Sequence, residues 1–360
     1  MKKVSLETIA KQLNISVVTV HKALKNQQGV GPELRNKILE LADQLGYVRR
    51  VSSPKRNYIH IIRKDFLIGM DERYYTTIYY YLNRECTNAD SKLFFVVHDI
   101  LSATMANVKN LMQETHIDGI FLSGQMDSDL LIEIEKLKIP VVCIDFYSSD
   151  YNFYYAYIDN YYAGYTLTKY LIRHGHRHIG FVGDIKFSNA VADRYFGCLR
   201  ALNKFDIPDR VFHLNSNIER FPDSFELNRN NLPTAFICHC DRAASVLYEK
   251  LKALGYRIPE DISGISFDNT EICDILSPKL TSLGIDKAVF AAQAFRLMDL
   301  ALQNKTDGIN YIKLNLSLYE RESVKDITQS SPSETENDCT FVALRSAHSA
   351  VRAQFPPRKI

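Results

Sequence analysis

The chain has 360 residues, of which 46% are hydrophobic and 24% are charged. These values are typical of a soluble globular protein of roughly two to three domains, and they exclude a fibrous or wholly disordered chain. No stretch approaches the roughly 18 apolar residues of a membrane span, and the first residues lack the apolar run of a signal peptide. We therefore expect a cytoplasmic protein without a membrane partner, whose seven cysteines are free thiols.

The net charge of +2 is divided unevenly along the chain. Residues 1–57 contain eleven Lys and Arg and four acidic residues, a net charge of +7, so the remaining 303 residues carry −5. A small basic segment on a mildly acidic body is expected of a nucleic-acid-binding protein, although a solvated basic tail would give the same charges.

Three short helices are predicted in residues 1–48, which we take as the first domain. Ser5 and Ser16 are suited to cap the first two, which a tight turn joins, and apolar residues recur along each with helical spacing. Pro32 suits the first turn of the third helix, and Gly46 suits its end. This pattern is typical of a helix-turn-helix unit.

The second helix is predicted to expose one face. Its inner side carries Val20, Ala23 and Leu24, which leaves outward a set of five residues: Val17, Val18, His21, Lys22 and Lys25. In a major groove, valine methyl groups can contact thymine and a Lys can donate to guanine, while Thr19 and Asn26 can donate to phosphates. A solvated helix in a small bundle would show the same pattern, so the pattern alone leaves both interpretations open.

The rest of the chain alternates between short β-rich runs and helical stretches. The β-rich runs are residues 93–100, 119–124, 140–145, 178–184, 234–240 and 262–269. The helical stretches include residues 104–116, 160–173, 242–255 and 286–303. This alternation predicts βαβ units and parallel sheets, and six such units favour two α/β lobes over one sheet.

Two segments lack this alternation. Residues 49–57 are basic, contain Pro54, and are expected to form an extended linker. Residues 326–360 are rich in Ser and Pro, without strand or helix periodicity, and are expected to form a disordered tail.

The first domain resembles the DNA-binding domain of the lactose-repressor (LacI/GalR) family of bacterial transcription regulators. The family elements occur in register as ETIA (7–10), ISVVTV (15–20), ALKN (23–26), VGPELR (30–35) and LGY (45–47). The resemblance implies that Val17, Val18 and Lys22 read bases. It also implies that the phosphates are anchored by Ser16, Thr19, His21 and Asn26.

The first domain also departs from the family pattern. The family usually has Ser-Arg where this chain has His21 and Lys22, and Ser where it has Gly31. Because Lys cannot reproduce the bidentate fork of Arg, the preferred operator is expected to differ. Residues 48–58 are shorter than the family's hinge helix and contain no leucine, so the residue that kinks the minor groove in the family has no counterpart here.

The body resembles the family's effector domain, which is similar to periplasmic sugar-binding proteins. The runs that carry the resemblance include IDGIFLSG (117–124), DRYFGCLRAL (193–202), GYRIPEDISGISFDN (255–269) and SPKLTSLGID (277–286). The resemblance implies two doubly wound lobes with a ligand at the carboxyl ends of the strands. We assign the effector domain to residues 58–325, with lobes formed by 58–157 with 284–312 and by 158–283 with 313–325.

The same resemblance implies effector-binding residues. Arg194 and Asp268 fall where the family holds the polar groups of its ligand, Arg194 as a donor and Asp268 as an acceptor for hydroxyls. Further candidates are Ser123, Asp145 and Asp159, although Asp159 is equally suited to cap the helix at 160–173.

Aromatic residues are dense near the lobes, and Tyr74 or Phe146 is suited to stack on a sugar ring, although helix faces and subunit interfaces use such residues too. Cys240 stands where the family more often has Asn, which removes a hydrogen-bonding amide from the expected site.

Metal and catalytic sites are not predicted. His174, His176 and His178 match a family turn, and the one-residue gap between Cys238 and Cys240 is too tight for a zinc knuckle. The sequence shows no nucleophile elbow, P-loop or dinucleotide motif, so we expect no enzyme and no cofactor.

The resulting prediction is a ligand-responsive repressor that binds a near-palindromic operator in double-stranded DNA as a homodimer. Its effector would be a small molecule, a carbohydrate or a related polar compound, in the cleft between the lobes. Two alternatives stay open. One is a cytosolic sugar-binding sensor whose helical head binds protein rather than DNA, and the other is a sugar-modifying enzyme.

Overall fold

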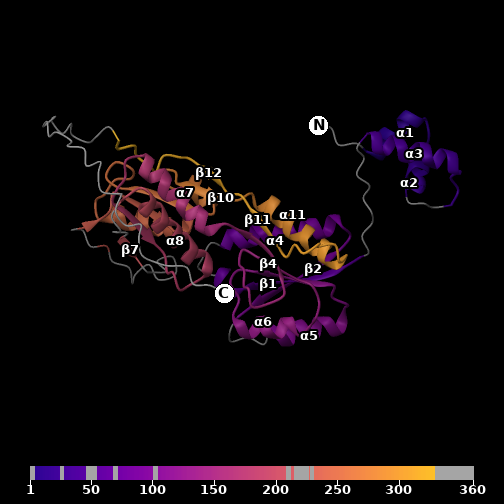
Figure 1. The fold of residues 1–360 in the computed structure, drawn as a ribbon, viewed down its shortest axis with the longest axis horizontal. Helices are drawn as coiled ribbons and strands as arrows, with labels where there is room; N and C mark the ends of the chain where they lie inside the picture. Colours follow the sequence, from indigo (N-terminus) through magenta and orange to yellow (C-terminus); the bar gives the residue numbers. More distant parts are fainter. Residues whose placement is uncertain are drawn as a thin grey trace, which may run out of the picture.

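The computed structural model describes residues 5–24, 28–45, 55–67, 72–99, 104–207, 212–214, 227 and 231–328. These residues form a bundle of three helices, the head, and a body of two α/β lobes (Figure 1). Figure 1 shows the head as a separate bundle beside the lobes. The predicted fold class, a helix-turn-helix head on a body of two doubly wound lobes, is confirmed.

The head contains α1 (Leu6–Leu13), α2 (Val17–Leu24) and α3 (Pro32–Gln44). Both predicted caps are present: the Ser5 hydroxyl accepts from the N–H of Thr8 at 3.3 Å, and the Ser16 hydroxyl from that of Thr19 at 3.0 Å. Each cap satisfies an N–H that has no partner inside its helix, which fixes where the helix starts. Between α1 and α2, Asn14 takes a left-handed φ of 51° that turns the chain.

The head has a hydrophobic core of its own. Ile9, Val20 and Ile38, one from each helix, are fully buried and lie in a single cluster. Burying an aliphatic side chain of this size contributes roughly 1.5–3 kcal/mol. The three helices therefore hold one another in place by apolar packing.

The first lobe is built on a six-stranded sheet whose strands are all parallel. In spatial order the strands are β11 (Tyr311–Leu314), β5 (Tyr154–Ile158), β4 (Val141–Ile144), β3 (Gly119–Ser123), β1 (Asn57–Arg63) and β2 (Lys92–His98). β3 and β4 are buried along their whole length, as expected for central strands of a sheet with both faces covered.

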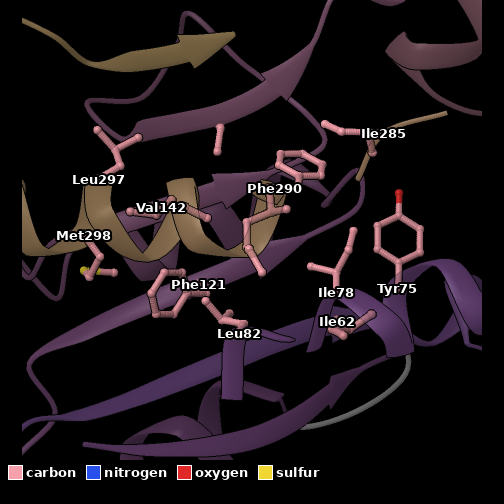
Figure 2. Close-up of a cluster of buried hydrophobic side chains, with 14 of the residues drawn as sticks. Ile62, Tyr75, Ile78, Leu82, Phe121, Val142, Ile285, Phe290, Leu297 and Met298 are labelled. Atoms are coloured by element: carbon pink, nitrogen blue, oxygen red, sulfur yellow. The ribbon is translucent and has the colours of Figure 1, made fainter. Parts of the chain in front are cut away.

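Helices cover both faces of this sheet. They are α4 (Glu72–Asn88) and α11 (Lys287–Leu302) on one face, and α5 (Thr104–Glu114) and α6 (Ser128–Glu135) on the other. Figure 2 shows the first of these layers, in which Leu82 of α4 and Met298 of α11 pack with Phe121 and Val142 of the sheet. Helices α4 and α11 therefore pack together as one layer on this face of the sheet.

The second lobe has a sheet in which five strands are parallel and the edge strand β12 is antiparallel to its neighbour. In spatial order the strands are β12 (Ser317–Tyr319), β10 (Thr281–Gly284), β9 (Ser263–Phe267), β8 (Ala235–Cys238), β6 (Ile179–Val182) and β7 (Phe212–Leu214). The covering helices are α7 (Asn160–Arg173) and α8 (Asn189–Lys204) on one face, and α9 (Asp241–Ala253) and α10 (Ile272–Ile275) on the other.

Helices α7 and α8 lie with their backbones in contact. A Cβ atom at Gly164 of α7 would overlap the carbonyl oxygen of Arg194, and one at Gly197 of α8 would overlap that of Tyr161. Only a residue without a side chain allows so close an approach. The two glycines therefore fix the position of α8, and with it the backbone of Arg194.

The chain crosses between the sheets three times: after β5, after β10 and after β11. The crossings are predicted after residues 157, 283 and 312, and the strands that precede them end at Ile158, Gly284 and Leu314. Asn57, which we placed in the linker, is the first residue of β1. Among the described residues, no helix has the length and apolar character needed to cross a membrane.

Most of the linker and of the tail lies outside the described residues. Gly46, residues 49–54 and residues 329–360 are among those that the structure does not describe. The described start of the tail is attached to the second lobe, since the N–H of Ile327 donates to the carbonyl of His174 at 2.9 Å. The expectations of an extended linker and of a disordered tail beyond this point stay predictions.

Candidate functional site

Helix α2 divides into a buried and an exposed face. Val20, Ala23 and Leu24 are at most 6% exposed and belong to the core of the head. Val17 is 40% exposed and Val18 is 62% exposed. Apolar side chains at these levels of exposure, on the first turn of a capped helix, are available to another molecule.

The polar residues predicted on α2 lie around the same face. His21, Lys22 and Ser16 are exposed, and the Thr19 hydroxyl lies 2.8 Å from that of Ser16. The structure therefore brings six of the eight predicted DNA-binding residues together on one helix and its cap. The other two, Lys25 and Asn26, lie outside the described residues.

A cavity of about 60 Å³ lies between the two lobes. It is lined by Phe66, Tyr74, Tyr75 and Asp145 of the first lobe, and by Phe187, Ser188, Ala190, Val191, Arg194, His239, Cys240 and Asp268 of the second. Asp145 directly follows β4, and Asp268 directly follows β9. The cavity thus lies at the carboxyl ends of the strands of both sheets, where open α/β sheets bind ligands.

Arg194 of α8 is held from three sides. Its Nε donates to Asn160 at 2.8 Å, its Nη1 to the carbonyl of His239, and its Nη2 to the Asp268 carboxylate at 3.2 Å. The guanidinium also lies 4.5 Å from the centre of the Phe267 ring. Burial alone would lower the pKa of Arg194, but the carboxylates nearby outweigh it and the pKa is raised. The charge is therefore fixed in place.

Asp145 is a buried carboxyl group with one satisfied oxygen. The Tyr75 hydroxyl donates to its Oδ2 at 2.9 Å, while its Oδ1 has no hydrogen-bond partner among the described residues. Burial raises the pKa of Asp145 to about 7; Arg194 opposes this shift and Asp268 adds to it. Such a carboxyl exchanges its proton near neutral pH and can accept a bond from a ligand.

The Asp268 carboxylate is positioned by the strand end beneath it. The chain there takes a φ of 98° at Asp268, and the Nζ of Lys287 donates to its carbonyl at 2.8 Å. Below, buried Asp241 accepts from the hydroxyl of Ser282 at 2.7 Å and from the hydroxyl of Thr270 at 2.9 Å. Burial, and then Asp268, raise the pKa of Asp241. These bonds fix the loop that presents Asp268.

Four of the seven predicted effector residues line the cavity: Arg194, Asp268, Asp145 and Tyr74. The other three are not among its lining residues. Ser123 is buried and bonds to His60 at 2.7 Å, where burial lowers the pKa of the imidazole to about 3. Asp159 caps α7 by accepting from Tyr162 at 2.9 Å and pairs with Lys313 at 2.9 Å. Phe146 packs in the core of the first lobe.

Several residues that line the cavity were not predicted from the sequence. Phe66 lies in the short 3₁₀ helix Lys64–Phe66 after β1, and Phe187 lies in the loop before α8. Tyr75 belongs to the aromatic run from which only Tyr74 was chosen. Phe66 lies after the end of a parallel strand, as Asp145 and Asp268 do, and this shared position could have indicated it. The sequence around Phe187 shows no such pattern.

Polar contacts close the cleft around this cavity. Arg73 of α4 pairs with Glu271 in the second lobe, and the N–H of Asn189 donates to Gln125 at 3.5 Å. Pockets for small molecules usually have about 300–1,000 Å³. Because this cavity is much smaller, the lobes must separate to admit a molecule of sugar size.

The histidine cluster considered for a metal has other bonds. The Nδ1 of His176 lies 2.9 Å from the Thr234 hydroxyl, and its Nε2 donates to the Lys325 carbonyl at 3.2 Å. No group of three or more side chains suited to hold a metal occurs in the part of the chain that the structure describes.

Comparison with known proteins extends these observations. Residues 168–324 match the family model of the periplasmic binding protein-like domain. The chain is 27% identical over 334 residues to the HTH-type transcriptional repressor PurR of Klebsiella pneumoniae, an alignment that covers 89% of this chain and 97% of that protein.

Two solved structures have the same fold. The complex of the transcriptional regulator CelR with cellobiose aligns with a TM-score of 0.63 at 20% identity, over 89% of this chain and 99% of CelR. The lac repressor dimer bound to operator and the anti-inducer ONPF aligns with a TM-score of 0.63 at 19% identity, over 90% of this chain and all of that one. The head, the lobes and the sequence relatives agree: the chain has the fold of the lac repressor and is similar in sequence, over most of its length, to HTH-type transcriptional repressors.

Proposed function

We propose that this chain is a repressor, without enzymatic activity or a cofactor, that acts in the cytoplasm as a homodimer on a near-palindromic operator. The observation that carries the proposal is the exposed face of α2, where Val17, Val18 and Lys22 point away from the core of the head. An exposed helix of this kind fits the major groove, and two heads related by a twofold axis read two half-sites.

The effector in this proposal is a carbohydrate that binds in the cavity between the lobes. Arg194 offers donors and Asp268 offers an acceptor, which together suit neighbouring hydroxyl groups. Tyr74 supplies an aromatic surface on the same cavity. The relative in complex with cellobiose has the same fold, which agrees with a sugar as ligand.

The position of the cavity between the lobes explains how effector binding is coupled to DNA binding in this proposal. A ligand that contacts Asp145 in one lobe and Arg194 in the other binds the closed arrangement better than the open one. It therefore shifts the population of lobe arrangements by its difference in affinity for the two. If one arrangement places the heads better on DNA, the effector and the operator influence each other's binding equally.

The direct test is the salt dependence of DNA binding by the full chain. Binding to duplex DNA should weaken by about a thousandfold or more between about 50 and about 200 mM salt if six or more phosphates are contacted. Sedimentation of the complex with a selected palindromic site should give two chains per duplex. An affinity for duplex that does not change with salt would contradict the proposal and favour a head that binds protein.

A further inference from the structure

One corner of the cavity combines aromatic rings with a carboxyl group. We call it the aromatic–carboxyl corner, and it consists of Phe66, Tyr74, Tyr75, Phe187 and Asp145. The rings form a connected group: the Phe66 ring centre lies 5.0 Å from that of Tyr75 and 5.4 Å from that of Phe187, and the centres of Tyr74 and Tyr75 are 5.0 Å apart.

The carboxyl group has an acceptor to spare. Asp145 is 7% exposed as a residue, its Oδ2 accepts from Tyr75, and its buried Oδ1 has no partner among the described residues. Its φ of 67° lies in the left-handed region, which costs free energy for a residue with a side chain. The fold thus maintains an unfavourable backbone conformation at a residue whose carboxyl group belongs to the lining of the cavity.

The charges around Asp145 do not neutralise it. Arg194 of α8 is the cation on the same cavity, and its donors are directed to Asp268, Asn160 and the His239 carbonyl. Lys287 of α11 donates to the carbonyls of residues 268 and 269. From α4, the Tyr75 hydroxyl donates to the Asp145 carboxyl, and Tyr74 lies close enough to oppose the rise of its pKa. With Asp145 ionised, the cavity carries two carboxylates against one guanidinium.

The rings of the corner attract cations in this structure. The guanidinium of Arg63 lies 5.5 Å from the centre of Phe66 and 5.7 Å from that of Phe187, and the Nζ of Lys287 lies 5.3 Å from that of Tyr74. The faces of aromatic rings are negative, and rings grouped around a site are used to bind ammonium ligands. A ring also has a second face, so contact with Arg63 leaves Phe66 and Phe187 able to line the cavity.

We propose that the effector carries a basic amine beside its hydroxyl groups, and that its ammonium binds in the aromatic–carboxyl corner beside the carboxylate of Asp145. This inference rests on the proposed function and makes the ligand class narrower: an amino sugar or a similar amino polyol rather than a neutral sugar. Its hydroxyls bind to Arg194 and Asp268 at the other end of the cavity.

The proposal predicts a direction for the pH dependence. Burial raises the pKa of Asp145 to about 7, so at lower pH a proton occupies the carboxylate that the ammonium needs. Affinity for an amine should therefore rise with pH, by roughly five- to tenfold between about pH 6 and about pH 7.5. Affinity for a neutral sugar should not rise, because a protonated Asp145 can still hydrogen-bond to a hydroxyl.

The experiment is titration calorimetry of the full chain with matched pairs of probes. Glucose is compared with its analogues that carry an amine at position 2, 3 or 6, at both pH values. At least one amine should bind more tightly than glucose and show the rise with pH. Equal or tighter binding of glucose, or no binding by any amine, would overturn the proposal.

Variants distinguish a role of the Asp145 carboxylate in ligand binding from a role in folding. Asp145→Asn should remove the pH dependence and weaken binding of the amine by about tenfold or more, because the ion pair is lost. Phe187→Leu should weaken the amine by roughly threefold and glucose less. Asp129→Asn, the same change at an exposed position of α6, is the control. An Asp145→Asn variant that melts normally and binds the amine like the parent chain would also overturn the proposal.

The two proposals fail in different ways. If the chain binds duplex with a steep salt dependence and responds to a neutral sugar alone, the amine is wrong and the proposed function stands. If an amine binds with the expected pH dependence but no salt-dependent DNA binding is found, the corner is assigned correctly and the repressor function is wrong.

Discussion

The Nη2 atom of Arg194 lies 3.2 Å from Oδ1 of Asp268, and the two side chains are only 6% and 11% exposed. A buried ion pair of this kind is sensitive to the loss of one partner, since the remaining charge loses its hydrogen-bonded counterion in a site with little water. We expect Asp268→Asn to lower the free energy of unfolding of the body by about 3 kcal/mol, measured by urea denaturation.

The matched control for this variant is the exposed pair between Arg257 and Asp261, whose closest atoms are 2.8 Å apart. Asp261→Asn should change stability little, because solvent screens an exposed pair. Equal losses in the two variants would show that burial does not decide the contribution of the Arg194 pair.

Two valines on α2 should respond in opposite ways to truncation. Val20 is fully buried, so Val20→Ala should destabilise the head by roughly 2 kcal/mol. Val18 is 62% exposed, so Val18→Ala should change stability by about 0.5 kcal/mol or less and alter the preferred DNA sequence. Thermal unfolding and selection of bound sequences measure the two effects. A stability loss in Val18→Ala matching that of Val20→Ala would contradict the assignment of faces.

Lys22 is predicted to read a base. Lys22→Ala should weaken operator binding by about 1–3 kcal/mol and relax specificity at one base pair. Lys11→Ala, an exposed lysine on α1, serves as the control. A uniform loss of affinity on every sequence tested would identify Lys22 as a phosphate contact instead.

Asp145 should make the stability of the body depend on pH. Because its pKa is raised to about 7 in the folded protein, the folded state retains this proton at pH values where the unfolded chain has lost it. Stability from this group is therefore full below the ordinary carboxyl pKa and is lost as the pH rises toward about 7, by at most about 1.4 kcal/mol per pH unit. Asp145→Asn should flatten this slope in melts between about pH 5 and about pH 8. Parallel curves for the two proteins would contradict the raised pKa.

Gly164 should not tolerate a side chain. Gly164→Ala places a Cβ against the backbone of Arg194, which should destabilise the second lobe by roughly 1–3 kcal/mol and weaken effector binding. Gly31→Ala is the matched control, since a Cβ there has open space around it and the backbone φ is not in the left-handed region. Unchanged stability in Gly164→Ala would mean that α7 and α8 can move apart without loss.

Regular elements with a complete pattern could be predicted from the sequence. The helix at 160–173 was expected with the bounds it has, because a capping residue precedes it and apolar residues recur along it. β11 and β12 were not identified, since they are short and alternate between exposed and half-buried positions. Their places in two different sheets depend on packing between distant segments, which local pattern does not contain.

The residues of the cavity, too, could be predicted only in part. Arg194 and Asp268 were predicted because their motifs match the family, whereas Ser123 was a further candidate of the same resemblance and Phe146 was chosen from a dense group of aromatic residues. A position at a strand end does not determine which side chain turns toward the cleft. Ser123 turns to His60 instead, and Phe146 turns into the core.

The three crossings of the chain between the sheets affect how such a protein can evolve. The described helices of the head occupy one unbroken stretch of sequence, so a single recombination event can exchange them whole. Neither lobe is contiguous, and no single cut in the gene separates one from the other. New operator preference can thus be acquired by swapping the head, while new ligand preference has to arise by point substitution within the body or by replacing both lobes together.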